Sequence, residues 1–287
     1  MPLFLGWADN YYRKPTGKET REATNLLHAT RPLLSVLASR EIDAVTASDV
    51  EAVRQFMIDS DLARNTINAR MGRVRRFIRW AISNKHAKPE SILIWESIAP
   101  LKYGRSPARE TRPVTSADVG AFNATLPYLP DMVRSMVMLQ LATGMRSGEL
   151  CSIRWDLIDR RDDVWIYIPA EHKTEHHGHD RNIAILPPAQ ELLGEPDKVG
   201  YVYVHGRGGI YTPDSYRRVI TRAIEKADCA YWTPHQLRHS AITDWATKGG
   251  VEVARLLAGH ASTRMTSRYI DITADRVIWA ARQVATG

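Results

Sequence analysis

Two arginines and one tyrosine in the second half of the chain could bind and attack a phosphate group. Arg146 follows a Thr-Gly turn, and Arg238 stands near the start of a later helix. A guanidinium group is planar, stays charged and can bind two phosphate oxygens at once. Tyr269 could act as a nucleophile once its phenol has lost its proton. These residue types together suit a reaction at a phosphodiester.

Polar residues close to both arginines could hold or assist them. Glu149 lies three residues after Arg146, so the two side chains share one face of a helix and could pair. His235 lies three residues before Arg238, in the first turn of a helix that Pro234 opens. A purely structural ion pair is the alternative for Arg146 and Glu149. A histidine near a helix start is also commonly a surface or capping residue.

A third cluster lies near the end of the chain. Gly259 is expected to end a helix and to bring His260 into a loop, and Tyr269 follows nine residues after that histidine. A lone tyrosine is more often an amphipathic packing residue. His239 and Ser240 are adjacent, but no triad arrangement surrounds them, which argues against a hydrolase.

The elements expected around these clusters are helices and a short sheet. Apolar periodicity favours helices over residues 132–141, 216–227, 236–247, 251–257 and 273–284. Residues 164–168 and 182–186 predict two strands separated by a polar stretch. We therefore expect a mixed α/β domain in this half, and a fold that is mainly α with a small β-sheet (α+β).

The first half of the chain is expected to be helical. Helices are predicted from Thr20 to Ala38, after a capping box of Ser48 and Glu51, and again from Thr66. The apolar face of the last helix consists of Ile67, Met71, Val74, Phe77 or Ile78, and Ala81. Its other faces carry arginines at positions 70, 73, 75, 76 and 79. These arginines form either a solvated basic face or a surface that lies along a DNA backbone.

A basic segment separates the two halves. Residues 100–115 show no periodicity and combine prolines and a glycine with Lys102 and several arginines, which is typical of a linker. We place the domain boundary near Arg105, which gives domains over residues 1–104 and 105–287.

The composition is that of a basic globular protein. A length of 287 residues suggests two domains. The formal net charge of +7 suits a polyanionic partner. Cys151 and Cys229 form neither a disulfide framework nor a CxxC pair, which indicates a reducing, cytoplasmic setting. We expect no membrane partner, because the sequence shows neither a signal peptide nor a long apolar run.

Several motifs occur in a fixed order along the chain. They are Thr143-Gly-Met-Arg146-Ser-Gly-Glu149-Leu150, Lys173-Thr174, His235-Gln-Leu-Arg238-His239, Gly259-His260 and Tyr269. Their order and spacing resemble those of the phage integrase, or tyrosine recombinase, family. The helical first half is similar to that family's core DNA-binding, SAM-like domain. Two features depart from the family pattern: Ala258 replaces a leucine, and the polar stretch after Lys173 is longer than the usual turn.

The resemblance implies a site-specific DNA recombinase, or integrase, that acts in DNA integration or excision without a metal or other cofactor. Tyr269 would attack the phosphate and form a 3′-phosphotyrosyl link, so rejoining would need no ATP. Arg146 and Arg238 would bracket the phosphate, and His260 would hydrogen-bond to it. Lys173 would protonate the leaving 5′ oxygen.

The resemblance also implies supporting residues. His235 would act as acid or base on the tyrosine side, and Glu149 would steady the neighbouring site. Contacts to the DNA backbone are expected from Arg70, Arg73, Arg76, Lys102 and Arg105.

The implied partner is double-stranded DNA at a specific site. We expect a homo-tetramer on paired sites, with an accessory DNA-bending protein as a further candidate partner. The expected final helix carries an apolar stripe of Val277, Ile278, Ala281 and Val284. In the family such a tail often docks on a neighbouring protomer; packing within its own chain is the alternative.

Other functions account for parts of the pattern. A topoisomerase of the IB kind shares the Arg-Lys-Arg-His-Tyr chemistry, but the helical first half argues against it. A DNA-binding regulator without enzymatic activity would have no use for Tyr269. A metal site is disfavoured because the spacing of four histidines in the polar stretch between the two predicted strands matches no zinc pattern. These histidines are His172, His176, His177 and His179.

Overall fold

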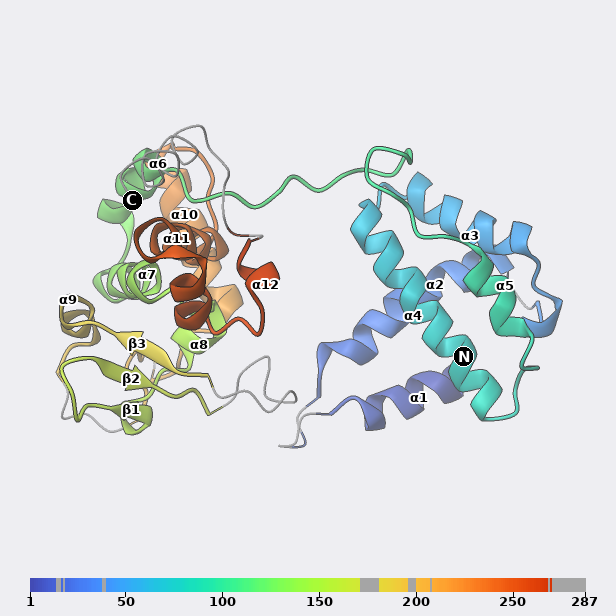
Figure 1. Cartoon of the computed structure of the whole chain (residues 1–287), viewed down its shortest axis with the longest axis horizontal. Coiled ribbons are helices and arrows are strands. Elements are labelled where there is room, and N and C mark those ends of the chain that lie inside the picture. Colours follow the sequence, from blue (N-terminus) through green and yellow to red (C-terminus); the bar gives the residue numbers. More distant parts are fainter. Residues whose placement is uncertain are drawn as a thin grey trace, which may run out of the picture. The chain divides into compact units, whose positions relative to one another are not determined.

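The computed structural model contains two compact units, Met1–Pro113 and Val114–Gly287 (Figure 1). It describes residues 1–13, 17, 19–37, 40–170, 181–195, 200–206, 208–267 and 269. Over these residues the chain is mostly helical with one three-stranded sheet, which confirms the predicted fold class.

The division between the units falls after Pro113, whereas the sequence placed the domain boundary near Arg105. Part of the basic segment packs on the first unit. Ala108 is buried in the core of that unit, and the Arg64 amide donates to the Arg109 carbonyl at 2.8 Å. An apolar side chain and a backbone hydrogen bond therefore attach this part of the segment to the first unit.

The described part of the first unit is helical. Its α-helices are α1 (Pro2–Tyr11), α2 (Arg21–Leu37), α3 (Ala47–Asp59), α4 (Arg64–Ser83) and α5 (Ser91–Ser97). Helix α2 packs against α1, α3 and α4. Helix α4 begins two residues before the predicted Thr66, and it buries the whole apolar face that the periodicity predicted.

The start of α3 corrects one prediction. Thr46, not Ser48, caps the helix: its Oγ1 accepts from the Asp49 amide at 3.3 Å, and Asp49 Oδ2 accepts from the Thr46 amide at 2.8 Å. Arg40 adds an ion pair to the same carboxylate at 2.6 Å. The predicted capping box of Ser48 and Glu51 is wrong, because the helix begins two residues earlier with a capping box of Thr46 and Asp49.

In the second unit, helices both precede and follow the small sheet along the chain. The helices are α6 (Val119–Thr125), α7 (Asp131–Thr143), α8 (Ser147–Cys151), α9 (Pro187–Gln190), α10 (Pro213–Ala227), α11 (Pro234–Ala258) and α12 (Thr263–Ser267). Helix α11 contains one non-helical residue, Gly250 with φ 82°, which falls in the break predicted between residues 247 and 251. The predicted helix at 273–284 lies outside the described residues.

The sheet is antiparallel with strand order β1-β2-β3. Its strands are β1 (Ile158–Asp159), β2 (Trp165–Tyr167) and β3 (Ile183–Ile185). Strands β2 and β3 are the two predicted strands. Strand β1 was not predicted, because two residues are too few to show a period of two.

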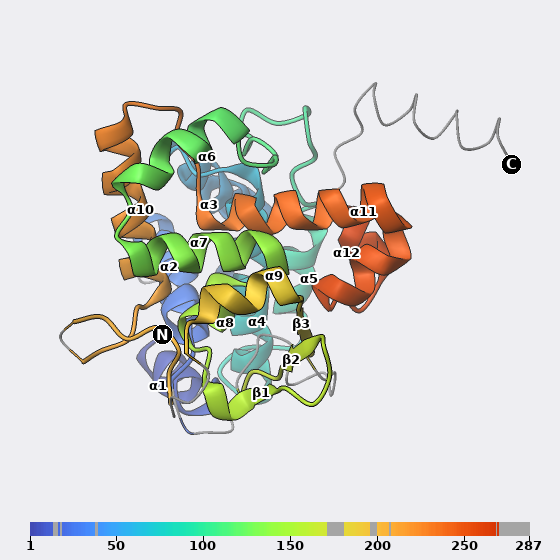
Figure 2. The ribbon, with the colours of Figure 1, turned by 90° about the vertical axis from the view of Figure 1, so that its left-hand side faces the viewer.

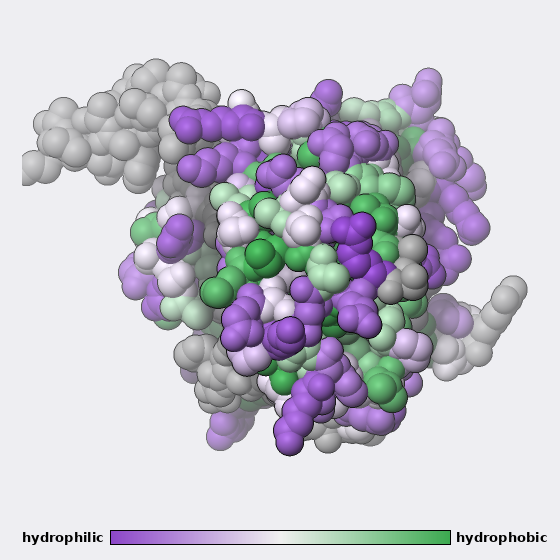
Figure 3. Space-filling model, turned by 90° about the vertical axis from the view of Figure 1, so that its right-hand side faces the viewer, coloured by the Kyte–Doolittle hydropathy of each residue, from purple (hydrophilic) through white to green (hydrophobic). Residues whose placement is uncertain are grey.

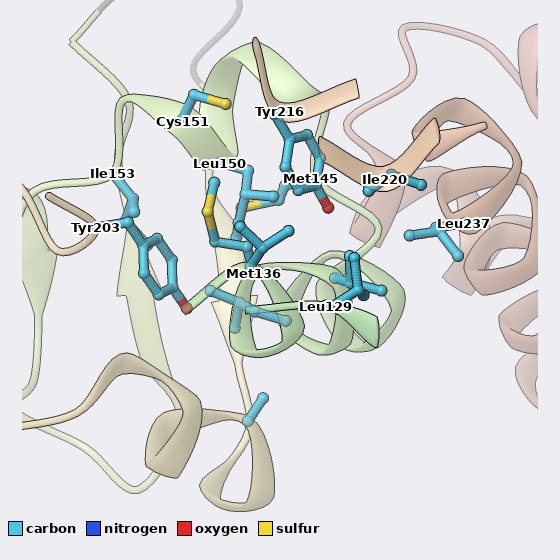
Figure 4. Close-up of a cluster of buried hydrophobic side chains, with 14 of the residues drawn as sticks. Leu129, Met136, Met145, Leu150, Cys151, Ile153, Tyr203, Tyr216, Ile220 and Leu237 are labelled. Carbon is cyan, nitrogen blue, oxygen red and sulfur yellow. The ribbon is translucent and has the colours of Figure 1, made fainter. Parts of the chain in front are cut away.

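The core of the second unit forms around α7, which lies beside α11 (Figure 2). Met136 of α7 meets Met145 and Leu150 of the following turn and helix (Figure 4). Burying each such side chain contributes about 1.5–3 kcal/mol. Cys151 at the end of α8 is also buried, and burial raises the pKa of its thiol to about 12. Helix α8 is thus held by the core on its inner side.

The surface is mixed in character. On the face drawn in Figure 3, hydrophilic side chains interrupt the apolar areas. Within the described ranges, no helix combines the length and the apolar character needed to cross a membrane.

Candidate active site

The turn that carries Arg146 is fixed by contacts from α7 and α11. Gly144 follows α7 in a left-handed conformation with φ 57°, which glycine adopts without steric cost. A Cβ there would lie 2.5 Å from Trp245 Cη2 of α11, so a larger residue would collide. Buried Gln140 donates from Nε2 to the Met145 carbonyl at 3.2 Å. These contacts place Arg146 at the start of α8.

Glu149 binds Arg146 in two ways. Its Oε2 accepts from the Arg146 amide at 2.7 Å, and its Oε1 accepts from Arg146 Nη1 at 2.6 Å. The Glu149 side chain is only 4% exposed, whereas Arg146 is 23% exposed. Burial alone would raise the pKa of Glu149, but the guanidinium groups of Arg181 and Arg146 bring it below its ordinary value. The carboxylate is therefore charged, and it holds Arg146 at the edge of the site.

Arg238 joins the ends of two helices. It is 1% exposed; its Nη1 donates to the Gly144 carbonyl at 2.6 Å and its Nη2 to the Ala258 carbonyl at 2.8 Å. Its buried Nε has no hydrogen-bond partner among the described residues. Burial, and then the charges of Arg146 and Arg181, lower the pKa of Arg238 to about 10. The guanidinium is still charged at neutral pH.

His260 lies directly beside Arg238. Gly259 ends α11 with φ 62° and turns the chain, so that His260 Nε2 lies 3.1 Å from Arg238 Nη2. His260 Nδ1 lies 3.0 Å from Thr266 Oγ1. Because a guanidinium only donates, Nε2 must accept, and the ring proton is on Nδ1 facing Thr266. Burial, followed by the charge of Arg238, lowers the pKa of His260 to about 4, so the ring is neutral at pH 7.

The Tyr269 ring lies among three histidines. It stacks on His260 with centroids 5.2 Å apart, and the rings of His239 and His235 lie 5.4 and 6.0 Å away. Thr243 Oγ1 donates to the Tyr269 carbonyl at 2.5 Å, which fixes the backbone of the tyrosine on α11. The side chain is partly exposed. Tyr269 is thus anchored beside the buried guanidinium and is accessible to solvent.

Arg181 is a site residue that the sequence reasoning missed. It is 2% exposed, and its Nε donates to Glu149 Oε1 at 3.4 Å. A signal was available: Arg181 lies two and four residues before Ile183 and Ile185, both fully buried on β3. The strand period of two therefore continues back to Arg181 and predicts that it too points inward.

The site carries an excess of positive charge. Within the described part of the chain, the guanidinium groups of Arg146, Arg181 and Arg238 gather around a single carboxylate, that of Glu149. His260 adds no charge at neutral pH. Counting only the described residues, two positive charges are thus left without an anion in a largely buried place, which is costly unless an anion binds there. The arrangement suits a phosphate.

Some predicted residues lie outside the described residues. Lys173 and the four histidines that the sequence analysis weighed as a metal site fall in the range 171–180, and the predicted apolar stripe falls in the range 270–287. Where the structure is described, no group of three or more His, Cys, Asp or Glu residues is placed to hold a metal ion.

The predicted DNA-binding residues all lie in the first unit. Arg73 Nη2 and Arg76 Nη1 bind the two oxygens of Glu22 at 3.0 and 2.8 Å. Their charge is therefore partly neutralised within the protein. The other three are Arg70, which is half-buried, and Lys102 and Arg105, which are exposed.

Known sequences share the pattern of this chain. The profile of the phage integrase family matches residues 113–276. A shufflon-specific DNA recombinase of Escherichia coli is 30% identical over 145 residues, which are 49% of this chain and 35% of that protein. The match thus spans only about a third of that relative. Tyrosine recombinase XerC of Corynebacterium glutamicum is 26% identical over 252 residues, covering 83% of this chain and 79% of that protein.

Solved structures share the fold. A lambda integrase dimer bound to a COC′ core site has a TM-score of 0.71 at 16% identity, covering 90% of both chains. A lambda integrase tetramer bound to a Holliday junction has a TM-score of 0.70 at 17% identity, covering 91% of this chain and 74% of that chain.

Proposed function

The chain belongs to the phage integrase family and is a tyrosine-type site-specific DNA recombinase, and from this premise we propose that Tyr269 cuts and rejoins DNA at a phosphate held by Arg146 and Arg238. The observation that carries the proposal is the buried excess of positive charge beside the Tyr269 ring. A DNA phosphodiester brings both a negative charge and non-bridging oxygens that accept from guanidinium N–H groups. Arg238 offers for this purpose a buried Nε–H that has no hydrogen-bond partner in the described part of the chain.

The proposed reaction exchanges one phosphate ester for another. The Tyr269 oxygen attacks phosphorus, a 3′-phosphotyrosyl bond forms and the bond to the 5′ oxygen breaks. His235, whose ring lies near that of Tyr269, takes the phenol proton, and Lys173 gives a proton to the leaving oxygen. Because the number of ester bonds is unchanged, the 5′-hydroxyl can reverse the reaction without ATP. Arg146 and Arg238 offset the charge that develops on the phosphate oxygens.

The role of His260 depends on which of its ring nitrogens carry a proton. Its Nε2 accepts from Arg238, so this nitrogen cannot at the same time donate to a phosphate oxygen. A second ring proton would allow that bond, and an anionic phosphate nearby favours the charged ring. We therefore propose that His260 becomes a donor only when the phosphate is bound.

The first unit is proposed to hold the DNA backbone. Lys102 and Arg105 are exposed and free of any ion pair to Glu22, so they can contact phosphates directly. Arg73 and Arg76 can do so by exchanging their shared Glu22 for phosphates. Such contacts release counterions and make the affinity depend on salt.

The proposed partner is double-stranded DNA at a specific site, with four copies of the chain on paired sites in the cytoplasm. The arrangement of lambda integrase as a tetramer on a Holliday junction supports four copies. We also propose that the reaction serves DNA integration or excision, with an accessory DNA-bending protein as a further partner.

Covalent capture tests the proposal. The purified protein is mixed with fragmented DNA from its source, without metal or ATP, and links that survive detergent are recovered and sequenced. Tyr269→Phe is the test variant, and Tyr128→Phe, which changes an exposed tyrosine of the same unit, is the matched control.

We expect links with the native protein and with Tyr128→Phe, and none with Tyr269→Phe. The captured ends would also give the DNA site. Equal capture by Tyr269→Phe would remove this tyrosine as the nucleophile, and capture by none of the three proteins would contradict the proposed reaction.

A further inference from the structure

Arg181 makes contacts with two separate elements of the site. Its Nε donates to Glu149 Oε1 on α8 at 3.4 Å, and its Nη1 donates to the Leu257 carbonyl on α11 at 3.1 Å. Its Nη2 is buried and has no hydrogen-bond partner within the described ranges. A buried guanidinium with an unused N–H lowers the stability of the folded state. Its position across two elements indicates a role in the site.

The guanidinium of Arg181 packs directly against the turn that precedes His260. A Cβ placed on Gly259 would lie 2.6 Å from Arg181 Nη1 and 3.0 Å from Arg181 Cδ. Gly259 also has φ 62°, which disfavours any other residue. Arg181 therefore contacts the final turn of α11 by a hydrogen bond and by close packing.

Glu149 Oε1 is shared between Arg181 and Arg146. Arg146 Nη1 approaches that oxygen at 2.6 Å and Arg181 Nε at 3.4 Å. Without Arg181, Arg146 would be the one guanidinium among the described residues that hydrogen-bonds to the buried carboxylate, and the carboxylate would bind it more strongly. Arg146 would then be less available to a phosphate, and the local excess of positive charge would be halved.

We propose that Arg181 is a positioning residue for the recombination reaction: it holds the Glu149 carboxylate, and through it Arg146, in a fixed relation to the turn that carries His260. This inference rests on the proposed function of the same site. Arg181 acts through these neighbours and not by attacking or protonating the DNA.

Replacing Arg181 tests this role. In Arg181→Met, the rate of covalent link formation with the captured DNA should fall about 10²-fold, as for loss of a preorganised donor. The affinity for that DNA should change by only about twofold, because the phosphate at this site is one of many phosphates whose contacts set the affinity. Arg181→Lys should recover part of the rate, because a lysine keeps the charge but cannot reach both partners with a planar fork.

Arg134→Met is the matched control. Arg134 also donates to two backbone carbonyls of the second unit, those of Leu126 and Leu129, but contacts neither Glu149 nor the α11 turn. Its rate of link formation should stay near that of the native protein. If Arg181→Met links at the native rate, or if its DNA affinity falls as far as its rate, the proposal is overturned.

A double-mutant cycle tests the connection through Glu149. If Arg181 acts by holding Glu149, adding Arg181→Met to Glu149→Gln should slow link formation by much less than it does in the native protein. If each substitution instead slows link formation by the same factor with or without the other, so that the two factors multiply in the double variant, the proposed connection is contradicted.

Hydrogen exchange provides a test without DNA. The amides of Gly259 and His260 donate to the Leu256 and Arg255 carbonyls, each at 3.0 Å. In Arg181→Met, exchange in a peptide over residues 257–267 should speed up, while Arg134→Met should leave it unchanged. Unchanged exchange in Arg181→Met overturns the inference. If the native protein forms no DNA link, the proposed function fails, and this measurement still decides the inference.

Discussion

Each unit contains a glutamate that accepts from two arginines, but the two groups lie in opposite environments. In the first unit, Glu22 binds two arginines of α4 whose side chains are 23% and 45% exposed. In the second unit, Glu149 is 4% exposed and binds Arg146 and the almost fully buried Arg181. The residue types are the same, and access to water is the main difference.

This difference in solvation separates the roles of the two groups. Water and salt screen an exposed ion pair, which typically contributes no more than about 1 kcal/mol. Such a pair can open at little cost when a DNA phosphate arrives. A buried group cannot exchange its partners in this way, and it keeps its charges fixed for a developing transition state. The surface group is suited to binding and the buried group to chemistry.

The largest expected effect is on stability. Glu149→Gln leaves buried Arg181 without a counter-charge and should lower the free energy of unfolding by about 3–5 kcal/mol. Glu22→Gln should lower it by at most about 1 kcal/mol. Urea unfolding of both variants measures the contrast. Equal losses would show that burial does not distinguish the two groups.

The next effect is on catalysis. Arg238→Lys should slow covalent link formation about 10²–10³-fold, since lysine cannot reproduce the planar fork that spans the ends of α7 and α11. Arg76→Lys in the first unit should change the rate by only about twofold. Single-turnover assays at saturating protein give both rates. A similar loss in both variants would contradict the assignment of chemistry to the buried group.

A smaller effect depends on pH. The pKa of His260 is about 4 in the folded protein, below the ordinary 6.5 expected in the unfolded chain. Between these values the unfolded chain binds a proton that the folded protein does not, so the free energy of unfolding falls as the pH falls from 6.5 to 4. This one histidine should account for up to about 3 kcal/mol. Urea unfolding at several pH values should show a flatter dependence for His260→Gln; an unchanged slope would exclude this source.

The smallest effect is on the salt dependence of DNA binding. Each lost phosphate contact should reduce the slope of log affinity against log salt by about 0.9. Lys102→Ala and Arg76→Ala should each show this reduction, whereas Lys85→Ala, at an exposed lysine outside the predicted DNA-binding set, should not. Filter binding or fluorescence anisotropy over a salt series measures the slopes. Identical slopes in all three variants would contradict the proposal that the first unit contacts the DNA backbone.

Much of the fold could be predicted because its main helices have clear periodicity. Helices α4, α7 and α10 appear within a few residues of their predicted positions, and the buried face of α4 agrees residue by residue. The start of α3 was misplaced because two capping boxes overlap, and the pattern alone cannot rank them. Strand β1 was missed because it is too short to have a pattern.

The site could be predicted in part. The motifs gave Arg146, Arg238, His260 and Tyr269, and the structure brings these four together. The missed residue, Arg181, belongs to no motif, and its burial follows only from continuing the β3 period into a polar stretch. The sequence also could not show that Nε2 of His260 faces Arg238, since that depends on the turn at Gly259.

The buried thiol of Cys151 has a practical consequence. Only a thiolate reacts rapidly with alkylating reagents, and a pKa of about 12 leaves almost none at neutral pH. Cys151 ends α8, the short helix that carries Glu149, so it can be modified only when this helix opens to solvent. The rate at which an alkylating reagent reaches Cys151, followed by mass spectrometry, would therefore report how often the helix beside the proposed phosphate site unfolds in the otherwise native protein.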